Sequence, residues 1–248
     1  MKISIVTAVF NAKKTVLAAL ESAFAQKHPD VELVVVDGVS TDGTMELLAA
    51  RRDQLGVFIS EPDKGIYHAL NKGIVRASGE VIGFLHADDL FTDELVLQRI
   101  AAVFADPGVD VCYGDLVYVR RDNPDRVIRY WRAGEYRSER LRRGWMPPHP
   151  TCYVRRSLYE EHGLFDTSYR IAADYDCMLR LLSRLRGRVV YIPEVLVRMR
   201  VGGVSNRSLA NILRKSAEDY RAIRANGVGG LGTLVWKNLS KLPQFIQR

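Results

Sequence analysis

The chain has 248 residues, 47% of them hydrophobic, which is enough for a sizeable core in one catalytic domain with an extension. Its formal net charge of +7 is uneven, because residues 1–115 carry 10 Lys and Arg against 17 Asp and Glu, and residues 116–248 carry 26 against 12. Three widely spaced cysteines indicate neither a disulfide framework nor a structural zinc site, and no apolar run approaches the roughly 18 residues of a membrane-spanning helix. The first residues enter a strand pattern without signal-peptide features, so we expect a cytoplasmic protein.

Short β-branched runs alternate with helical patterns through the front half, which is typical of a parallel sheet covered by helices on both faces. Strands are expected at 3–7, 33–36, 57–59 and 81–85. Helices are expected after Asn11 as an N-cap, from about 41–44, and over 66–77. These elements predict an α/β fold with three layers and a mostly parallel central sheet.

The back half is less regular. Two short strands are expected within 109–119, a long Arg-rich loop over 120–150, a helix at 174–185, a strand at 189–192 and a helix at 208–225. We expect a catalytic domain over residues 1–205, divided into halves at 1–115 and 116–205. A basic helical C-terminal extension is expected over 206–248.

Acidic residues follow two of the predicted strands. Asp88 and Asp89 come after the strand at 81–85, and Asp37 directly follows the strand at 33–36. Adjacent carboxylates at a strand end are costly unless a cation or hydrogen-bond donors compensate them, and such oxygens suit Mg²⁺ or Mn²⁺ bound to phosphate. The alternative for Asp89 is that it caps a helix beginning near Thr92.

Several short motifs occur in a fixed order between residues 3 and 205. They are Val6-Thr7-Ala8-Val9-Phe10-Asn11, the segment from Asp37 to Thr44, Glu61-Pro62-Asp63-Lys64-Gly65-Ile66-Tyr67, Asn71-Lys72-Gly73, Ala77-Ser78-Gly79-Glu80, Ala87-Asp88-Asp89, His149-Pro150, Phe165-Asp166, Asp174-Tyr175-Asp176 and Gly202-Gly203-Val204-Ser205. Each motif is weak alone, but together they make the chain resemble the family-2 glycosyltransferases. The resemblance implies their nucleotide-diphospho-sugar transferase (GT-A-like) fold and inverting sugar transfer.

The resemblance assigns the front half to a nucleotide-diphospho-sugar donor. The residues that it implies for donor binding are Thr7, Ala8, Val9, Asn11, Asp37, Asp63, Lys64, Ala87, Asp88, Asp89 and His149. Asp37 would recognise the base or ribose, with Asp63 and Lys64 completing that pocket. Asp63 also fits a simple turn before Gly65.

Metal binding follows from the same resemblance. Asp88 matches the last acid of the family's Asp-x-Asp motif and would reach the metal and the diphosphate, whereas the first position of that motif is His86 here. His86 is either a metal ligand as a neutral imidazole or a hydrogen-bonding group. Asp89 would contact the sugar, or contact a metal ligand without binding the metal itself. His149 would contact the diphosphate or metal.

Asp174 matches the family's catalytic base and precedes a helical pattern. A carboxylate at a helix N-terminus is kept ionised by the helix dipole, as a base requires. The alternative is a helix cap, a role that suits Asp176 better.

The basic back half favours an anionic partner, although a solvated basic surface has the same composition. We expect a glycan or polyprenyl-linked acceptor in bacterial cell-surface polysaccharide biosynthesis, with the protein in the cytoplasm or peripheral on the inner face of the cell membrane. Residues 231–248 place apolar side chains among lysines, which suits either a membrane surface or packing on the domain. The absence of interleaved stacking aromatics argues against nucleic acid.

Three other readings compete. A dehydrogenase lacks support, because Ala8-Val9-Phe10-Asn11 follows the first strand in place of a Gly-x-Gly-x-x-Gly turn. A sugar nucleotidyltransferase would use a similar acidic metal site on a nucleoside triphosphate. A degenerate nucleotide-sugar-binding module is the third alternative, motivated by His86.

Overall fold

The structure is a computed structural model and describes residues 1–202 and 209–240. One nine-stranded sheet runs through this part of the chain, in the order β3-β2-β1-β4-β8-β6-β9-β5, with β7 paired to β6. The strands are β1 (Ile3–Val9), β2 (Val31–Asp37), β3 (Val57–Ser60), β4 (Val81–Phe84), β5 (Leu90–Phe91), β6 (Val109–Val119), β7 (Val127–Trp131), β8 (Tyr153–Arg155) and β9 (Arg188–Arg200). Strands β1 to β4 are mutually parallel, and β6 and β9 form a second parallel pair.

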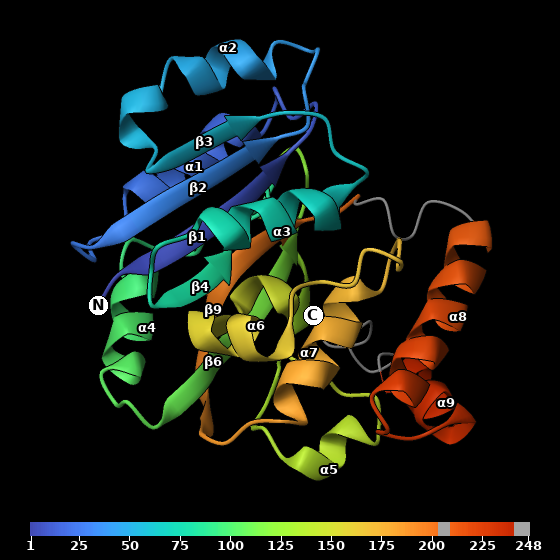
Figure 1. Cartoon of the computed structure of the whole chain (residues 1–248). Coiled ribbons are helices and arrows are strands. Elements are labelled where there is room, and N and C mark those ends of the chain that lie inside the picture. The colour runs from blue at the N-terminus through green and yellow to red at the C-terminus, as the bar shows by residue number, and fades with distance from the viewer. Residues whose placement is uncertain (203–208, 241–248) are drawn as a thin grey trace.

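Successive side chains of a strand point to opposite faces of the sheet, so each inner strand contributes to two apolar cores. In β1, Val6 faces one core, and Ile3 and Ile5 face the other. The helices are α1 (Val16–Phe24), α2 (Thr44–Ala49), α3 (Ile66–Arg76), α4 (Val96–Phe104), α5 (Ser138–Leu141), α6 (Arg156–His162), α7 (Ala173–Leu182), α8 (Leu209–Ala225) and α9 (Leu231–Leu239). Helices α3, α6 and α7 cover one face, and α1 and α4 cover the other (Figure 1). The three-layer prediction is confirmed.

Three expectations for local structure were wrong. Helix α1 begins at Val16 after Thr15, whereas Asn11 has a φ of +48° and lies in the preceding loop. Residues 109–119 form the single strand β6, because β9 pairs along its whole length. The expected loop at 120–150 contains β7, which β6 holds in the sheet, and the short helix α5.

The C-terminal helices pack on the catalytic layers. Ala222 and Ile223 of α8 belong to the core that also contains α7. Lys237 of α9 is buried, lies 2.6 Å from Asp219 of α8, and stands over the ring of Tyr175 at 3.1 Å from its centroid. Among the described residues, no helix is long and apolar enough to cross a membrane. The predicted Gly203 turn and the residues from 241 onward lie outside the described part.

Candidate active site

The carboxyl ends of the parallel strands meet at one edge of the sheet, where ligands bind in open α/β sheets. Asp37 is the last residue of β2, and His86 to Asp89 follow β4 directly. The loops after β1 and β2 are tied together: Asn11 donates its backbone N–H to Ser40 Oγ at 2.8 Å and accepts the N–H of Thr41 on Oδ1 at 2.9 Å. Asn11 therefore shapes this edge instead of capping α1.

Asp37 is buried at the predicted nucleoside pocket. Its carboxylate accepts hydrogen bonds from the backbone N–H and hydroxyl of Ser40, at 3.1 and 2.5 Å, and from the hydroxyl of Ser60 at 2.9 Å. Because the side chain has no exposed surface, Asp37 orders its own loop in this conformation. Direct recognition of a base or ribose by Asp37 would require these hydrogen bonds to be exchanged, and it stays a prediction.

Three segments meet beside Asp37. A side chain on Gly38 would place its Cβ 2.6 Å from Asp63 Oδ2 and 3.3 Å from Phe10, so only glycine lets these residues approach. Asp63 also accepts the N–H of Gly65 at 2.7 Å, which orders the turn before α3. Phe10 and Lys64 are exposed at this point, whereas the side chains of Thr7 and Val9 are buried in β1 and leave only backbone for a ligand.

The predicted metal site lies in the loop after β4, residues 86–89, here named the metal loop. Asp88 is half-buried, and its carbonyl oxygen accepts a 2.7 Å hydrogen bond from Nη1 of Arg200. Ala87 and Asp89 are buried, and neither carboxyl oxygen of Asp89 has a hydrogen-bond partner. Burial and the charge of Asp88 raise the pKa of Asp89 well above its usual range, although Arg200 lowers it in part. Helix α4 begins only at Val96, so Asp89 caps no helix.

This donor set fits a divalent cation bound together with substrate phosphates. A cation beside Asp88 and Asp89 would compensate the two carboxylates that the protein leaves without a full set of partners. The described residues contain no cluster of three or more His, Cys, Asp or Glu suited to a metal. Mg²⁺ commonly takes only one or two protein carboxylates, with substrate phosphates and water completing its coordination.

His86 and His149 lie next to each other, with ring centroids 6.1 Å apart. His149 is buried, stacks on Phe84 at 4.8 Å between centroids, and leaves its Nε2 without a partner. Burial lowers the pKa of His149 to about 4, against the opposing charge of Asp174. Burial likewise lowers the pKa of His86, whose Nδ1 is unpartnered, while Asp88 and Asp174 raise it. Both imidazoles are neutral near pH 7 and can accept a proton, a metal or a hydrogen bond.

Asp174 completes the group. It is half-buried in the first turn of α7, and its Oδ1 accepts the N–H of Tyr175 at 2.8 Å. Its charge raises the pKa of both histidines. The ring of Phe165 lies 5.5 Å from that of His149 and 5.7 Å from that of Tyr67, whose hydroxyl is 3.3 Å from Asp174 Oδ1. Asp37 ends β2 and Asp63 follows β3, and β1 separates both strands from β4 in the sheet. Asp176 is buried and bound to Arg180 and Asn226, at 3.0 and 2.8 Å.

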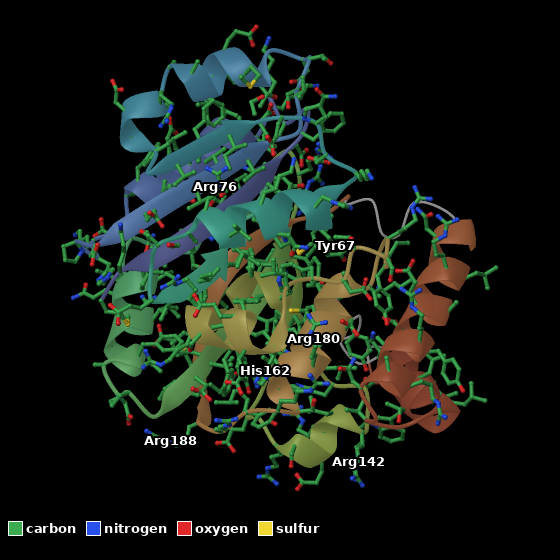
Figure 2. All side chains as sticks on the ribbon, in the orientation of Figure 1. Tyr67, Arg76, Arg142, His162, Arg180 and Arg188 are labelled. Carbon is green, nitrogen blue, oxygen red and sulfur yellow. The ribbon has the colours of Figure 1, made fainter. Side chains whose placement is uncertain are left out.

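Two site residues were missed by sequence reasoning. Tyr67 was quoted within a motif without a role, and its hydroxyl lies 3.3 Å from Asp174 Oδ1, on the side of α3 that faces the segment leading into α7 (Figure 2). Arg200 ends β9, and the sequence shows only one more arginine in an Arg-rich region. Its burial beside the metal loop becomes visible only when β9 pairs with β6.

With acidic loops at the carboxyl ends of β2 and β4, the sheet has the GT-A fold, as two solved structures show. TarS 1–349 from S. aureus in complex with UDP superposes with a TM-score of 0.70 at 20% identity, covering all of this chain and 71% of that one. The mannosyltransferase PcManGT from Pyrobaculum calidifontis, in complex with GDP-Man and Mn²⁺, gives 0.64 at 20% identity, covering 99% of this chain and 73% of that one.

The family follows from similarity to known sequences. The profile of glycosyl transferase family 2 matches residues 4–163. A PGL/p-HBAD biosynthesis glycosyltransferase from Mycobacterium tuberculosis is 30% identical over 208 residues, which cover 82% of this chain and 78% of the relative. An uncharacterized glycosyltransferase from Nostoc sp. is 30% identical over 223 residues, covering 85% and 68% of the two chains. The chain belongs to glycosyl transferase family 2 and is a glycosyltransferase.

Proposed function

We propose that the chain is an inverting glycosyltransferase that moves a sugar from a nucleoside-diphosphate donor to a hydroxyl group of a glycan or polyprenyl-linked acceptor. The observation that carries this proposal is the position of Asp174. Its half-buried carboxyl group lies 3.3 Å from the hydroxyl of Tyr67, whose ring is 5.7 Å from that of Phe165, and Phe165 lies 5.5 Å from His149. This arrangement supports a base near the loop at which the diphosphate is proposed to leave.

The proposed reaction is a single displacement. Asp174 accepts the proton of the acceptor hydroxyl while the hydroxyl oxygen forms a bond to the anomeric carbon. The bond between that carbon and the donor's phosphate oxygen breaks, and the nucleoside diphosphate leaves with the electron pair. General-base help of this kind contributes about 10²- to 10⁴-fold in rate.

The leaving group is stabilised at the metal loop. Asp88, with His86 and Asp89 as further candidates, would hold Mg²⁺ or Mn²⁺, which supplies charge neutralisation at the diphosphate when bound. Arg200 orients this loop through the carbonyl of Asp88. His149 stays neutral because of its burial and offers its free Nε2 to a phosphate or metal, without adding a charge.

The experiment that tests this proposal separates binding from turnover. Two structural neighbours contain UDP-GlcNAc or GDP-Man, so both donors are screened with Mn²⁺ or Mg²⁺, alone and with chelator. We expect Asp88→Ala to lose metal-dependent donor binding, and Asp174→Asn to keep binding while donor turnover falls by at least about 10²-fold. Full turnover by Asp174→Asn would remove the base from the proposal. Pyrophosphate release from a nucleoside triphosphate would favour a nucleotidyltransferase instead.

For the acceptor, we propose a lipid-linked glycan of bacterial cell-surface polysaccharide synthesis, met in the cytoplasm at the inner face of the membrane. The support is an exposed apolar face on α9, formed by Leu231, Val235, Trp236 and Leu239. The exposed Arg142 and Arg143 adjoin it, since the carbonyl of Arg142 accepts a hydrogen bond from Thr233 of α9 at 2.8 Å. An apolar helix face with neighbouring cations suits an anionic membrane surface.

Vesicle flotation tests the membrane contact. We expect the protein to float with phosphatidylglycerol vesicles but not with phosphatidylcholine vesicles, and the double variant Val235→Ser, Trp236→Ser to lose this binding. The matched control is Val127→Ser, Ile128→Ser, which removes an equally exposed apolar pair from β7. Equal loss in both double variants, or no binding by the unaltered protein, would contradict this part of the proposal.

A further inference from the structure

The helix that carries Asp174 has no cap of its own. Helix α7 begins after Ala172, which has no side chain able to accept a hydrogen bond from the first turn. The first N–H groups of a helix need partners from elsewhere, and a Ser, Thr, Asp or Asn at the cap position normally supplies one. Within α7, Asp174 Oδ1 accepts one of these N–H groups, that of Tyr175, whereas the residues just before the helix are bound by another part of the chain.

Glu218 of α8 accepts the three backbone N–H groups just before the helix, those of residues 170–172. Its Oε2 accepts the backbone N–H groups of Ile171 and Ala172, at 2.8 and 3.0 Å. Both of its carboxyl oxygens lie 3.1 Å from the N–H of Arg170. One carboxylate thus collects consecutive amides at the entrance to α7. An anion at this position also interacts favourably with the positive end of the helix dipole.

Helix α8 is itself held in place on the C-terminal side of Glu218, by Arg221 and by Asn226, which directly follows the helix. The guanidinium of Arg221 lies 3.6 Å from the ring centroid of Tyr169 and donates to Ser168 Oγ at 3.0 Å. One turn further, Asn226 donates to Asp176 Oδ1 at 2.8 Å. These contacts fix the register of α8 against the segment that leads into and begins α7.

The peptide units around Ile171 are held from two opposite elements. Glu218 of α8 accepts the N–H of Ile171, and the hydroxyl of Tyr67 on α3 donates to the carbonyl oxygen of Ile171 at 2.7 Å. Asp174 follows only three residues later, in the first turn of α7. A shift of this segment would move the Asp174 carboxyl group with respect to the metal loop.

We propose that Glu218 is a positioning residue for Asp174, so that the C-terminal extension forms part of the catalytic apparatus. This inference rests on the proposed role of Asp174 as the base. Glu218 acts on the backbone of residues 170–172 and not on the donor. Misplacement of a catalytic group by about 1 Å can cost about 10²-fold in rate, because the reacting atoms must meet in a narrow range of geometries.

The test uses the whole chain with Mn²⁺ and the donor, UDP-GlcNAc or GDP-Man, that it hydrolyses. We expect Glu218→Ala to lower kcat by about 10- to 100-fold, with donor Kd unchanged within about twofold. Glu218→Gln keeps an acceptor oxygen and should retain more activity than the alanine variant. Glu160→Ala is the matched control, since it removes an exposed glutamate of α6 that pairs with Arg156 and leaves the 170–172 amides bound; its kcat should stay within about threefold of the unaltered protein.

A second arm separates positioning from general loss of structure. On the Asp174→Asn background, Glu218→Ala should lower the residual rate no further, because the group that it positions is already gone. An additive loss in that double variant, an equal loss in Glu160→Ala, or a parallel loss of donor binding would overturn the inference. If Asp174→Asn abolishes turnover while Glu218→Ala leaves kcat intact, the inference fails and the proposed function stands. If Asp174→Asn is fully active, the proposed base itself fails.

Discussion

The hydroxyl of Tyr67 lies between Asp174 Oδ1, at 3.3 Å, and the carbonyl oxygen of Ile171, at 2.7 Å. Burial and the charge of Asp174 raise the pKa of Tyr67 above its usual range, so the hydroxyl stays protonated and donates a hydrogen bond to the carbonyl oxygen of Ile171. This contact joins α3, which follows the donor-side loop at Asp63, to the segment that carries the base.

Tyr67→Phe removes this contact with little change in volume. The carbonyl of Ile171 would lose its donor, which costs about 1–3 kcal/mol for a buried group. We expect a lower melting temperature and a kcat reduced about tenfold, with donor Kd unchanged. Circular dichroism melts and donor turnover with Mn²⁺ check this prediction. A normal kcat in a folded Tyr67→Phe variant would show that the hydroxyl does not help to position Asp174.

Arg200→Met should weaken metal-dependent donor binding by about tenfold, the effect of losing one charge-assisted hydrogen bond. Its guanidinium donates to the carbonyl of Asp88, and its charge adds to the larger effect of the Arg200 backbone N–H in lowering the pKa of Asp89, so loss of the guanidinium would favour protonated Asp89 and a less ordered metal loop. Calorimetric titration of the donor with Mn²⁺ measures the change. The control is Arg198→Met, two residues earlier in β9, whose partner Asp125 is exposed. Equal weakening in both variants would contradict a specific role for Arg200.

Glu32→Gln should change how stability depends on pH. Burial would raise the pKa of Glu32, but hydrogen bonds from Ser4 and Ser78 and the charge of Lys2 outweigh it and lower the pKa. The unfolded chain, with a carboxyl pKa of about 4.3, therefore takes up the proton first, and this stabilisation is present above that pH and lost as the pH falls through the folded value. Urea unfolding between pH 3 and 6 should show a shallower dependence in Glu32→Gln. An unchanged slope would contradict the prediction.

Lys237→Met should destabilise the fold strongly, because it leaves Asp219 buried beside Tyr175 without its cation. Breaking a buried pair from one side costs about 3–5 kcal/mol. The double variant Lys237→Met, Asp219→Asn should recover part of this loss, which urea unfolding measures. Arg156→Met is the surface control: its partner Glu160 lies four residues away in α6, and an exposed pair of this kind contributes less than about 1 kcal/mol.

Sequence reasoning predicted the front of the fold well, for a physical reason. Strands β1, β2 and β4 are buried on both faces, so their apolar runs mark them directly, and a parallel sheet places the residues that follow them at one edge. The acidic loops at Asp37 and Asp88 were therefore found from local patterns. The profile match to the family, residues 4–163, covers this same region.

What could not be predicted depends on contacts between distant segments. The strand β7 is exposed at its first two residues and half-buried at the other three, and it forms because β6 offers it an edge. The prediction that Asn11 caps the first helix was wrong because its side chain binds the loop after β2, some thirty residues away. The proposed roles of Arg200 and Glu218 depend on where β9 and α8 pack. The sequence around these two residues does not indicate that packing.

The pairing of β5 has a consequence for how the protein is made. This two-residue strand bonds to β9 at Val197 and Arg198, while β4, on the other side of the metal loop, joins β1. Strands β1 to β4 are all synthesised within the first 84 residues, and Phe91 of β5 can bond to Ser22 of α1 soon afterwards. The loop from His86 to Asp89 gains its remaining contacts, from β9 to β5 and from Arg200 to Asp88, only when residue 200 has been synthesised. Because a domain generally folds as a unit, the proposed metal site would be completed late in synthesis, when most of the catalytic domain is already present.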